Sequence, residues 1–153
     1  MQEMRRKEKE ITDRKEIDEI IARAEVVHLA MTNGSKPYVV PLSFGYDGKN
    51  IYFHSANEGA KLDFIRKNPE VCFEFTVDIL YQGIKTGCKA SASYKCVIGW
   101  GRCEIVSDNE LKKAAYDVIM GQYAKGKFEY TPAMLLKSTV VKIVITELKG
   151  KKS

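Results

Sequence analysis

The spacing of hydrophobic residues changes along the chain and divides it into helical and strand-like stretches. The first stretch is helical, because its apolar residues recur every three or four positions. They form one stripe, made of Ile17, Ile20, Ile21 and Ala24. Thr12 or Asp13 can cap this helix, since both side chains can accept a hydrogen bond from a first-turn amide. The stripe predicts a helix that packs on a core.

After residue 25 the period changes to two, which predicts β-strands. Three runs are separated by short turn sequences, and we expect them to form an antiparallel meander. They cover residues 25–32, 38–46 and 51–55. The first turn holds Asn33-Gly34, which favours the positive φ angles of a hairpin. Pro41 cannot donate to a ladder, so the second strand should lie at a sheet edge or be bulged.

Three longer strands follow in the second half of the chain. Residues 71–79 alternate strictly between apolar and polar. The buried face should carry Val71, Phe73, Phe75, Val77 and Ile79. The region 90–106 contains Gly99 and Gly101, which suggest a bend, a bulge or close approach of a ligand. The last strand covers 138–148.

Helical segments occupy the connections between strands. One spans about 58–67 and ends at Asn68-Pro69. Ser107 and Glu110 have the spacing of a capping box before a longer amphipathic helix. Thr131-Pro132 can start one further helical turn.

Hairpins with helices at their connections predict an α+β fold. We expect one domain over residues 1–153, built on six antiparallel strands that form a closed or partly closed barrel with peripheral helices. About ten residues at the start, and residues 149–153, are expected to be flexible ends.

Composition narrows the function classes. The net charge is +5, and much of it lies in the basic ends, which is typical of solvated tails; nucleic acid is therefore not an expected partner. The apolar runs are too short to span a membrane, and the charged N-terminus does not resemble a signal peptide, so we expect a cytoplasmic protein without a membrane partner.

The four cysteines do not indicate a metal site. They are Cys72, Cys88, Cys96 and Cys103. None forms a C-x-x-C pair, and the chain has only two histidines, so zinc-ligand spacing is absent. We expect reduced thiols on strands and no metal.

The junction after the third strand can hold an anion. Ser55 can donate a hydroxyl hydrogen bond, and the amides around Gly59 lie at the expected start of a helix, where they favour a phosphate. Lys61 adds a positive charge. Glu58 would repel a phosphate unless its carboxylate points outward, and Walker-loop spacing is absent. On local chemistry alone, an ordinary strand–loop–helix joint remains the alternative.

Residues 38–75 and 93–106, together with His28–Met31, resemble the flavin-binding split barrels related to pyridoxamine 5′-phosphate oxidase. The similarity is greatest to the Nim-type nitroimidazole-resistance subgroup and covers roughly residues 5–148. It implies a six-stranded antiparallel split β-barrel.

The resemblance also implies a cofactor, FMN, bound in a groove at a homodimer interface. The flavin ring is expected along the backbone of four residues, namely Val40, Pro41, Leu42 and Ser43. Ser55 and Lys61, with the amides near Gly59, are expected to hold the ribityl phosphate.

Three further positions are less defined by the resemblance. His54 could face the flavin or its substrate as a proton donor, or be a strand histidine bonded to backbone. Trp100 could stack near the partner's flavin or belong to the core. Cys96 stands where the family often has serine, so a hydroxyl contact would be lost or replaced by a weaker thiol contact.

The function implied is that of an FMN-dependent oxidoreductase reducing a small organic acceptor, such as a nitroimidazole-type nitro compound, with NAD(P)H as a candidate electron donor. A flavin-binding sensor without turnover and a haem-binding split-barrel relative are the alternatives. The vitamin B6 reaction is not expected, because the second phosphate of its substrate needs further basic groups and the loop 81–90 offers only Lys85 and Lys89.

Overall fold

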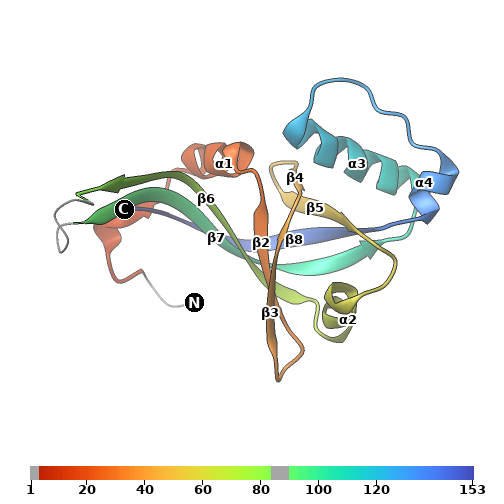
Figure 1. Cartoon of the computed structure of the whole chain (residues 1–153), viewed down its shortest axis with the longest axis horizontal. Helices are drawn as coiled ribbons and strands as arrows, with labels where there is room; N and C mark the ends of the chain where they lie inside the picture. Colours follow the sequence, from red (N-terminus) through yellow and green to blue (C-terminus); the bar gives the residue numbers. More distant parts are fainter. Residues whose placement is uncertain (1–3, 84–89) are drawn as a thin grey trace.

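The computed structural model describes residues 4–83 and 90–153. Lys85, Cys88 and Lys89 lie outside this part of the chain. One antiparallel sheet forms the body, in the order β3-β2-β6-β7-β8-β5-β4, with β1 paired to β8 (Figure 1). Its strands are β1 (Glu10–Ile11), β2 (Val27–Thr32), β3 (Pro37–Leu42), β4 (Gly45–Tyr46), β5 (Asn50–Ser55), β6 (Glu70–Gln82), β7 (Ser91–Val106) and β8 (Thr139–Lys152).

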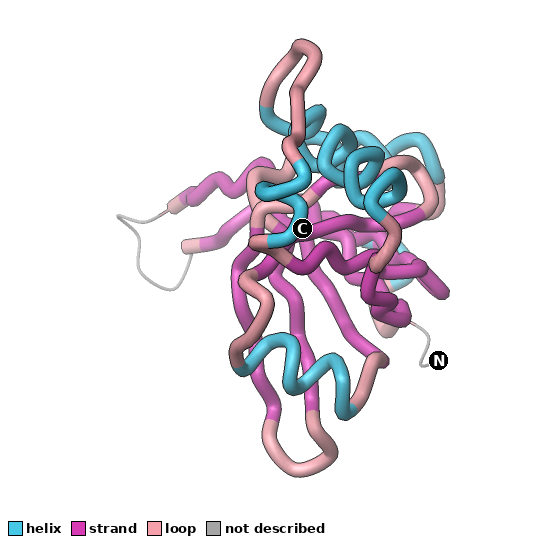
Figure 2. Tube along the Cα trace, turned by 90° about the vertical axis from the view of Figure 1, so that its right-hand side faces the viewer, coloured by secondary structure: helices cyan, strands magenta, loops and turns pink. Residues whose placement is uncertain are grey.

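Helices lie on the outside of the sheet. They are the 3-10 turn η1 (Lys7–Lys9) and the α-helices α1 (Arg14–Arg23), α2 (Ala60–Lys67), α3 (Asn109–Tyr123) and α4 (Pro132–Leu136). Figure 2 shows α2 at the opposite end of the sheet from α3. None of the helices in the described ranges is long and apolar enough to cross a membrane. The α+β class with peripheral helices is confirmed.

The sheet curls until its two edges come close together. β3 and β4 are the edges of the strand order, yet only Ser43 and Phe44 separate them along the chain. A link of two residues spans only about 10 Å from Leu42 to Gly45, so the sheet must bend back on itself. The result is a half-barrel closed by the chain rather than by a ladder, which confirms the predicted split barrel. Its sheet has eight strands in the described residues, not six, because β1 and β4 are additional strands of two residues each.

Both hairpins of the predicted meander are present, but the link divides the second run between them. β2 pairs with β3, and the third run, β5, pairs with β4 and on its other side with β8. The strand predicted over 38–46 breaks at Ser43, and its two parts lie at opposite edges. Pro41 does lie in an edge strand, as its missing N–H predicted.

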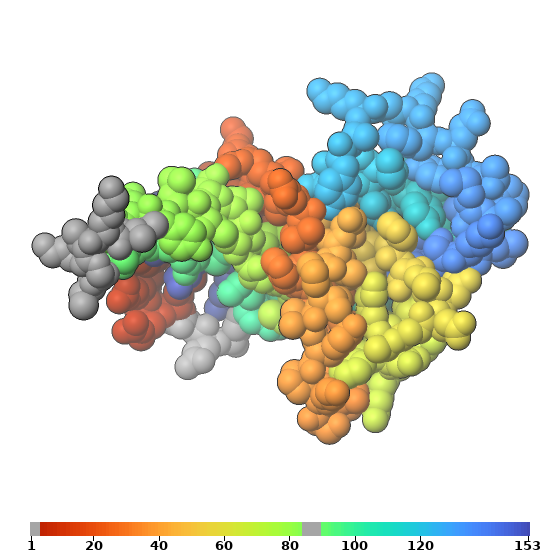
Figure 3. Space-filling view, in the orientation of Figure 1, coloured from red at the N-terminus to blue at the C-terminus, as the bar shows by residue number. Residues whose placement is uncertain are grey.

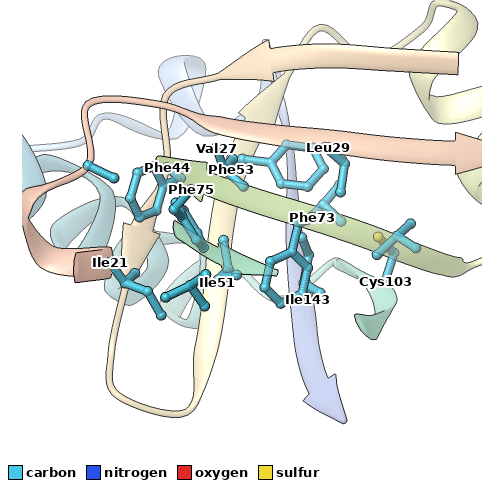
Figure 4. Close-up of a cluster of buried hydrophobic side chains, with 14 of the residues drawn as sticks. Ile21, Val27, Leu29, Phe44, Ile51, Phe53, Phe73, Phe75, Cys103 and Ile143 are labelled. Carbon is cyan, nitrogen blue, oxygen red and sulfur yellow. The ribbon is translucent and has the colours of Figure 1, made fainter. Parts of the chain in front are cut away.

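The core fills the inside of the curl, where aromatic rings from several strands meet (Figure 4). Its central, fully buried side chains include Leu29, Phe44, Phe53, Phe73 and Phe75. The helical stripe of α1 packs against them as predicted, and Asp13 caps that helix by accepting from the Lys15 amide at 3.0 Å.

The predicted buried face of β6 ends one residue early. Ile79 is 52% exposed, although the alternation up to Val77 places it inside. Asp78 has a positive φ of 57°, and the pairing with β7 shifts between Val77 and Leu80. This bulge turns the following side chains out of the core.

The two strand glycines of β7 serve packing. The register with β8 shifts between Trp100 and Gly101, which confirms the predicted irregularity. A Cβ at Gly99 would lie 2.3 Å from the Phe73 ring, and one at Gly101 would lie 2.6 Å from the Val144 carbonyl oxygen. Close approach of the protein itself therefore explains both glycines.

Two local expectations differ from the structure. Asp108, not Ser107, caps α3, because its carboxylate accepts from the Leu111 amide at 2.9 Å. The C-terminal residues do not form a loose end, since β8 continues to Lys152 and Gly150 is buried against Ile11. The β1–β8 pairing explains this difference, because it gives the last residues a ladder partner.

Candidate functional site

The junction between β5 and α2 leaves its backbone accessible. Gly59 is the N-cap of α2, with φ 127° and ψ 164°, a conformation that favours glycine. Its carbonyl accepts from the amides of Leu62 and Asp63 at 3.0 and 3.2 Å. Apart from Gly59 and its chain neighbours, no atom of the described residues lies within 4 Å of where a Cβ at Gly59 would be. A ligand can therefore approach this helix N-terminus closely.

The loop before Gly59 is anchored by a residue that the sequence did not single out. The Asn57 amide nitrogen donates to the Leu136 carbonyl at 2.8 Å, and its oxygen accepts from the Thr139 hydroxyl at 3.0 Å. The sequence carried no local signal for this anchor, because both partners lie about 80 residues further along the chain. The anchor fixes the exposed junction to the start of β8.

Lys61 brings an uncompensated positive charge to this junction. Its ammonium group lies 5.5 Å from the centroid of the Phe53 ring. Within the described ranges it forms no ion pair with a carboxylate. Burial lowers the pKa of Lys61, because the charged form loses solvent. A phosphate would compensate that charge.

His54 and Ser55 are neighbours in sequence but lie on opposite faces of β5. Ser55 shares its face with the buried Phe53, over which Lys61 lies. The His54 ring faces α3 instead, 5.8 Å from the Tyr116 ring between centroids. The structure thus places Lys61 over the face of β5 that carries Phe53 and Ser55, and close enough to His54 for its charge to act on that ring.

The surroundings of His54 favour its neutral form. Burial lowers the pKa of His54 below its ordinary value of 6.5, and the nearby charge of Lys61 lowers it further. The Tyr116 ring, which the sequence did not single out, stacks in turn on Tyr130 at 5.2 Å, and its hydroxyl bonds to that of Ser138. A neutral imidazole can accept a proton, but it is a weaker acid than the proton donor that was expected.

The open edge of β3 holds the four residues expected along a flavin ring. β3 pairs with β2 alone in the described part of the sheet, so its other edge is free. Val40 and Leu42 pack on the core, whereas Pro41 and Ser43 are exposed. In the space-filling view the orange surface of β3 adjoins the yellow surface around β5 and α2 (Figure 3). The edge of β3 and the β5–α2 junction therefore share one face.

Trp100 lies away from the β5–α2 junction of its own chain. It pairs with Cys72 and lines a hollow of about 300 Å³ on the outer face of the sheet. In the sheet, His54 of β5 pairs with Val140 of β8, and Val140 pairs on its other side with Val106 of β7. Six strand residues separate Trp100 from Val106, a distance of roughly 20 Å. The structure does not bring Trp100 to Ser55 and Lys61, and a contact with a partner's flavin stays a prediction.

The cysteines have the character of packing residues. The three described ones, Cys72, Cys96 and Cys103, are free thiols as expected. Burial raises the pKa of each, for Cys103 to about 12, which disfavours the reactive thiolate. The described residues include no cluster of three potential metal ligands.

Comparison with known proteins assigns the fold. The family model of pyridoxamine 5′-phosphate oxidase matches residues 13–152. The chain belongs to this family. A candidate 5-nitroimidazole antibiotic resistance protein from Bacteroides thetaiotaomicron is 30% identical, with 94% of this chain and 86% of that chain covered and a TM-score of 0.84. The family and its Nim-type branch, predicted from the sequence, are thus confirmed.

Solved structures of lower identity share the fold, and one further relative matches part of the sequence. A flavocytochrome from Azotobacter vinelandii is 17% identical over 99% of this chain and 72% of its own, with a TM-score of 0.84. An FAD-binding protein from Mesorhizobium loti is 23% identical over 91% and 94%, with a TM-score of 0.67. An uncharacterized protein of Rhizobium meliloti is 30% identical over 64 residues, a stretch of 42% of this chain and 42% of that relative.

Proposed function

We propose that this protein binds FMN at the β5–α2 junction. Ser55, Lys61 and the amides around Gly59 would hold the phosphate, and the backbone of Val40–Ser43 would lie along the ring. The observation that carries the proposal is the half-buried Lys61, which has no carboxylate partner among the described residues and lies beside an unobstructed helix N-terminus. Membership of the pyridoxamine 5′-phosphate oxidase family, and the fold shared with an FAD-binding protein, support it.

The residues at the junction fit a phosphate-bearing cofactor. Gly59 leaves room at its Cβ position, and Asn57 holds the loop in place without occupying that room. Glu58 is exposed, so its carboxylate need not face the anion. These features favour the anion site over an ordinary strand–loop–helix joint.

When bound, FMN supplies the electron transfer itself. The protein would bind the cofactor and orient it. Lys61 and Ser55 fix one end of the cofactor, and the free backbone groups of the β3 edge can bond to polar atoms of the ring. Val40 and Leu42 anchor that edge to the core. His54, neutral and next to the phosphate group, can accept a proton or donate its ring N–H to a bound acceptor.

We further propose that the reaction is the reduction of a small organic acceptor, of the nitroimidazole type, by electrons from NAD(P)H. The likeness to the Bacteroides protein supports this acceptor class. A homodimer would complete the site, since the β3 edge is open in the single chain. We place the reaction in the cytoplasm, where free thiols such as those of this chain stay reduced.

The visible spectrum of the purified protein, followed by steady-state assays with NAD(P)H and a nitroimidazole, tests this function. We expect a yellow protein with flavin absorbance and consumption of both substrates. A Soret band would instead favour the haem-binding alternative. Tight FMN binding without turnover for any donor would contradict the enzyme and leave a flavin-binding sensor. A titration with FAD beside FMN distinguishes the two flavins.

A further inference from the structure

The open edge of β3 is fixed at its C-terminal end by Phe44. The Phe44 side chain is fully buried and packs on Phe75, with 4.8 Å between ring centroids. The Phe44 amide donates to the hydroxyl of Tyr123 at 2.9 Å. The residue directly after Ser43 is therefore held by its ring in the core and by its amide on α3.

The Tyr123 hydroxyl joins three segments of the chain. It accepts from the Phe44 amide and donates to the Glu25 carbonyl, also at 2.9 Å, in the link between α1 and β2. The Tyr123 ring stands edge-on to Phe44 at 6.5 Å between centroids. The Tyr123 side chain is 47% exposed. Its contribution to the structure therefore comes mainly from these two hydrogen bonds and less from burial of its ring.

Helix α3 is a rigid support for this bond. A Cβ at Gly45 would lie 2.5 Å from backbone atoms of Val118 and Ile119, so α3 and β4 are already as close as they can be. The amide nitrogen of Gln122, which has two N–H groups to donate, lies 3.0 to 3.3 Å from three carbonyl oxygens at the end of α1. The packing of α3 on Gly45 thus sets the position of Tyr123 without involving β3, and Gln122 adds a separate tie to α1.

We infer that Tyr123 is a positioning residue for the flavin site, an inference that rests on the proposed function. Its hydroxyl holds the Phe44 amide and thereby sets where the Val40–Ser43 backbone lies against the ring. Gln122 ties the same helix end to α1, and its side-chain hydrogen bonds within the described residues go to α1 and its C-cap. Variants at these two neighbouring positions can therefore distinguish a positioning role from general support of the fold.

The test compares Tyr123→Phe, which keeps the ring and removes the hydroxyl, with Gln122→Leu. Amide hydrogen exchange of residues 42–44 reports on local opening of the β3 edge in the cofactor-free protein. The β7 amides of the same variant serve as the internal reference for overall stability. FMN titration reports on the site. For Tyr123→Phe we expect exchange of these amides to accelerate selectively and the Kd for FMN to rise on the order of tenfold. Gln122→Leu should lower stability and leave both readouts near the wild-type values.

Equal effects of the two variants would overturn the inference, because Tyr123 would then be an ordinary structural support. A selective increase in exchange with unchanged FMN affinity would overturn the link to the cofactor. If the wild-type chain binds no FMN, the proposed function fails and the flavin role of Tyr123 fails with it. Normal wild-type binding that Tyr123→Phe leaves unchanged overturns the role of Tyr123 alone.

Discussion

The ammonium group of Lys61 lies over the ring of Phe53, with 5.5 Å between Nζ and the ring centroid. Phe53 is fully buried, so the cation rests on the edge of the hydrophobic core. A ring face attracts a cation but does not neutralise it. The charge is therefore held at the start of α2 and remains available to an anionic ligand.

His54 should make the ligand-free protein less stable in mild acid. Its folded-state pKa lies below 6.5, so the unfolded chain binds more protons between the two pKa values. The free energy of unfolding should then fall as the pH drops through about 6.5, and level off below the folded-state pKa. Urea unfolding over this pH range measures the effect. His54→Gln should reduce the slope, and Lys61→Gln should reduce it in part; an unchanged slope in both variants would contradict the assignment.

Gly45→Ala should destabilise the fold strongly. The new Cβ would meet backbone atoms of α3 at 2.5 Å, and backbone cannot move aside as a flexible side chain can. We expect a loss of about 3 kcal/mol, at the upper end of typical overpacking.

Gly121→Ala, in the helix α3 against which Gly45 packs, is the matched control. The new Cβ would meet no neighbouring atom in the described residues. Within a helix such as α3, alanine is favoured over glycine by about 1 kcal/mol. Chemical denaturation should therefore show changes of opposite sign for the two variants. Similar changes would mean that α3 does not lie against β4 as closely as described.

Tyr46→Phe should cost about 1 kcal/mol of unfolding free energy. The Tyr46 hydroxyl donates to Asp18 at 2.6 Å and accepts from Arg14 at 2.7 Å, which ties α1 to the β4–β5 turn. Burial, followed by the Asp18 hydrogen bond, raises the pKa of Tyr46 to about 12. Because the folded-state pKa is the higher one, this contribution is present below pH 10 and is lost as the pH rises toward 12. Thermal unfolding at neutral and alkaline pH measures both effects, and equal melting curves for variant and wild type would refute them.

The sequence predicted elements whose signals are local. The stripe of α1, its Asp13 cap and the edge position of β3 follow from periodicity, side-chain chemistry and the missing N–H of Pro41. The Ser55–Lys61 grouping was also accessible, because both residues lie within one short strand–loop–helix segment.

Features that depend on distant parts of the chain were not accessible. Whether β5 pairs with β3 or with β8 depends on the curl of the whole sheet, which short turns do not specify. Ile79 follows the alternation of β6, but a bulge at Asp78 overrides the pattern. Tyr123 comes from a helix about 80 residues away from Phe44, and no local motif links the two.

The most direct test of the account is FMN binding by Ser55→Ala/Lys61→Ala, with Lys67→Ala as control, measured by calorimetry. Lys67 is an exposed lysine in the last turn of the same helix, so its removal matches the charge change. We expect the double variant to lose about 2–4 kcal/mol of binding free energy, from two charge-assisted contacts of about 1.5–3 kcal/mol each with incomplete additivity. The control should bind as the wild type does. Unchanged FMN affinity in a folded double variant would contradict the phosphate site.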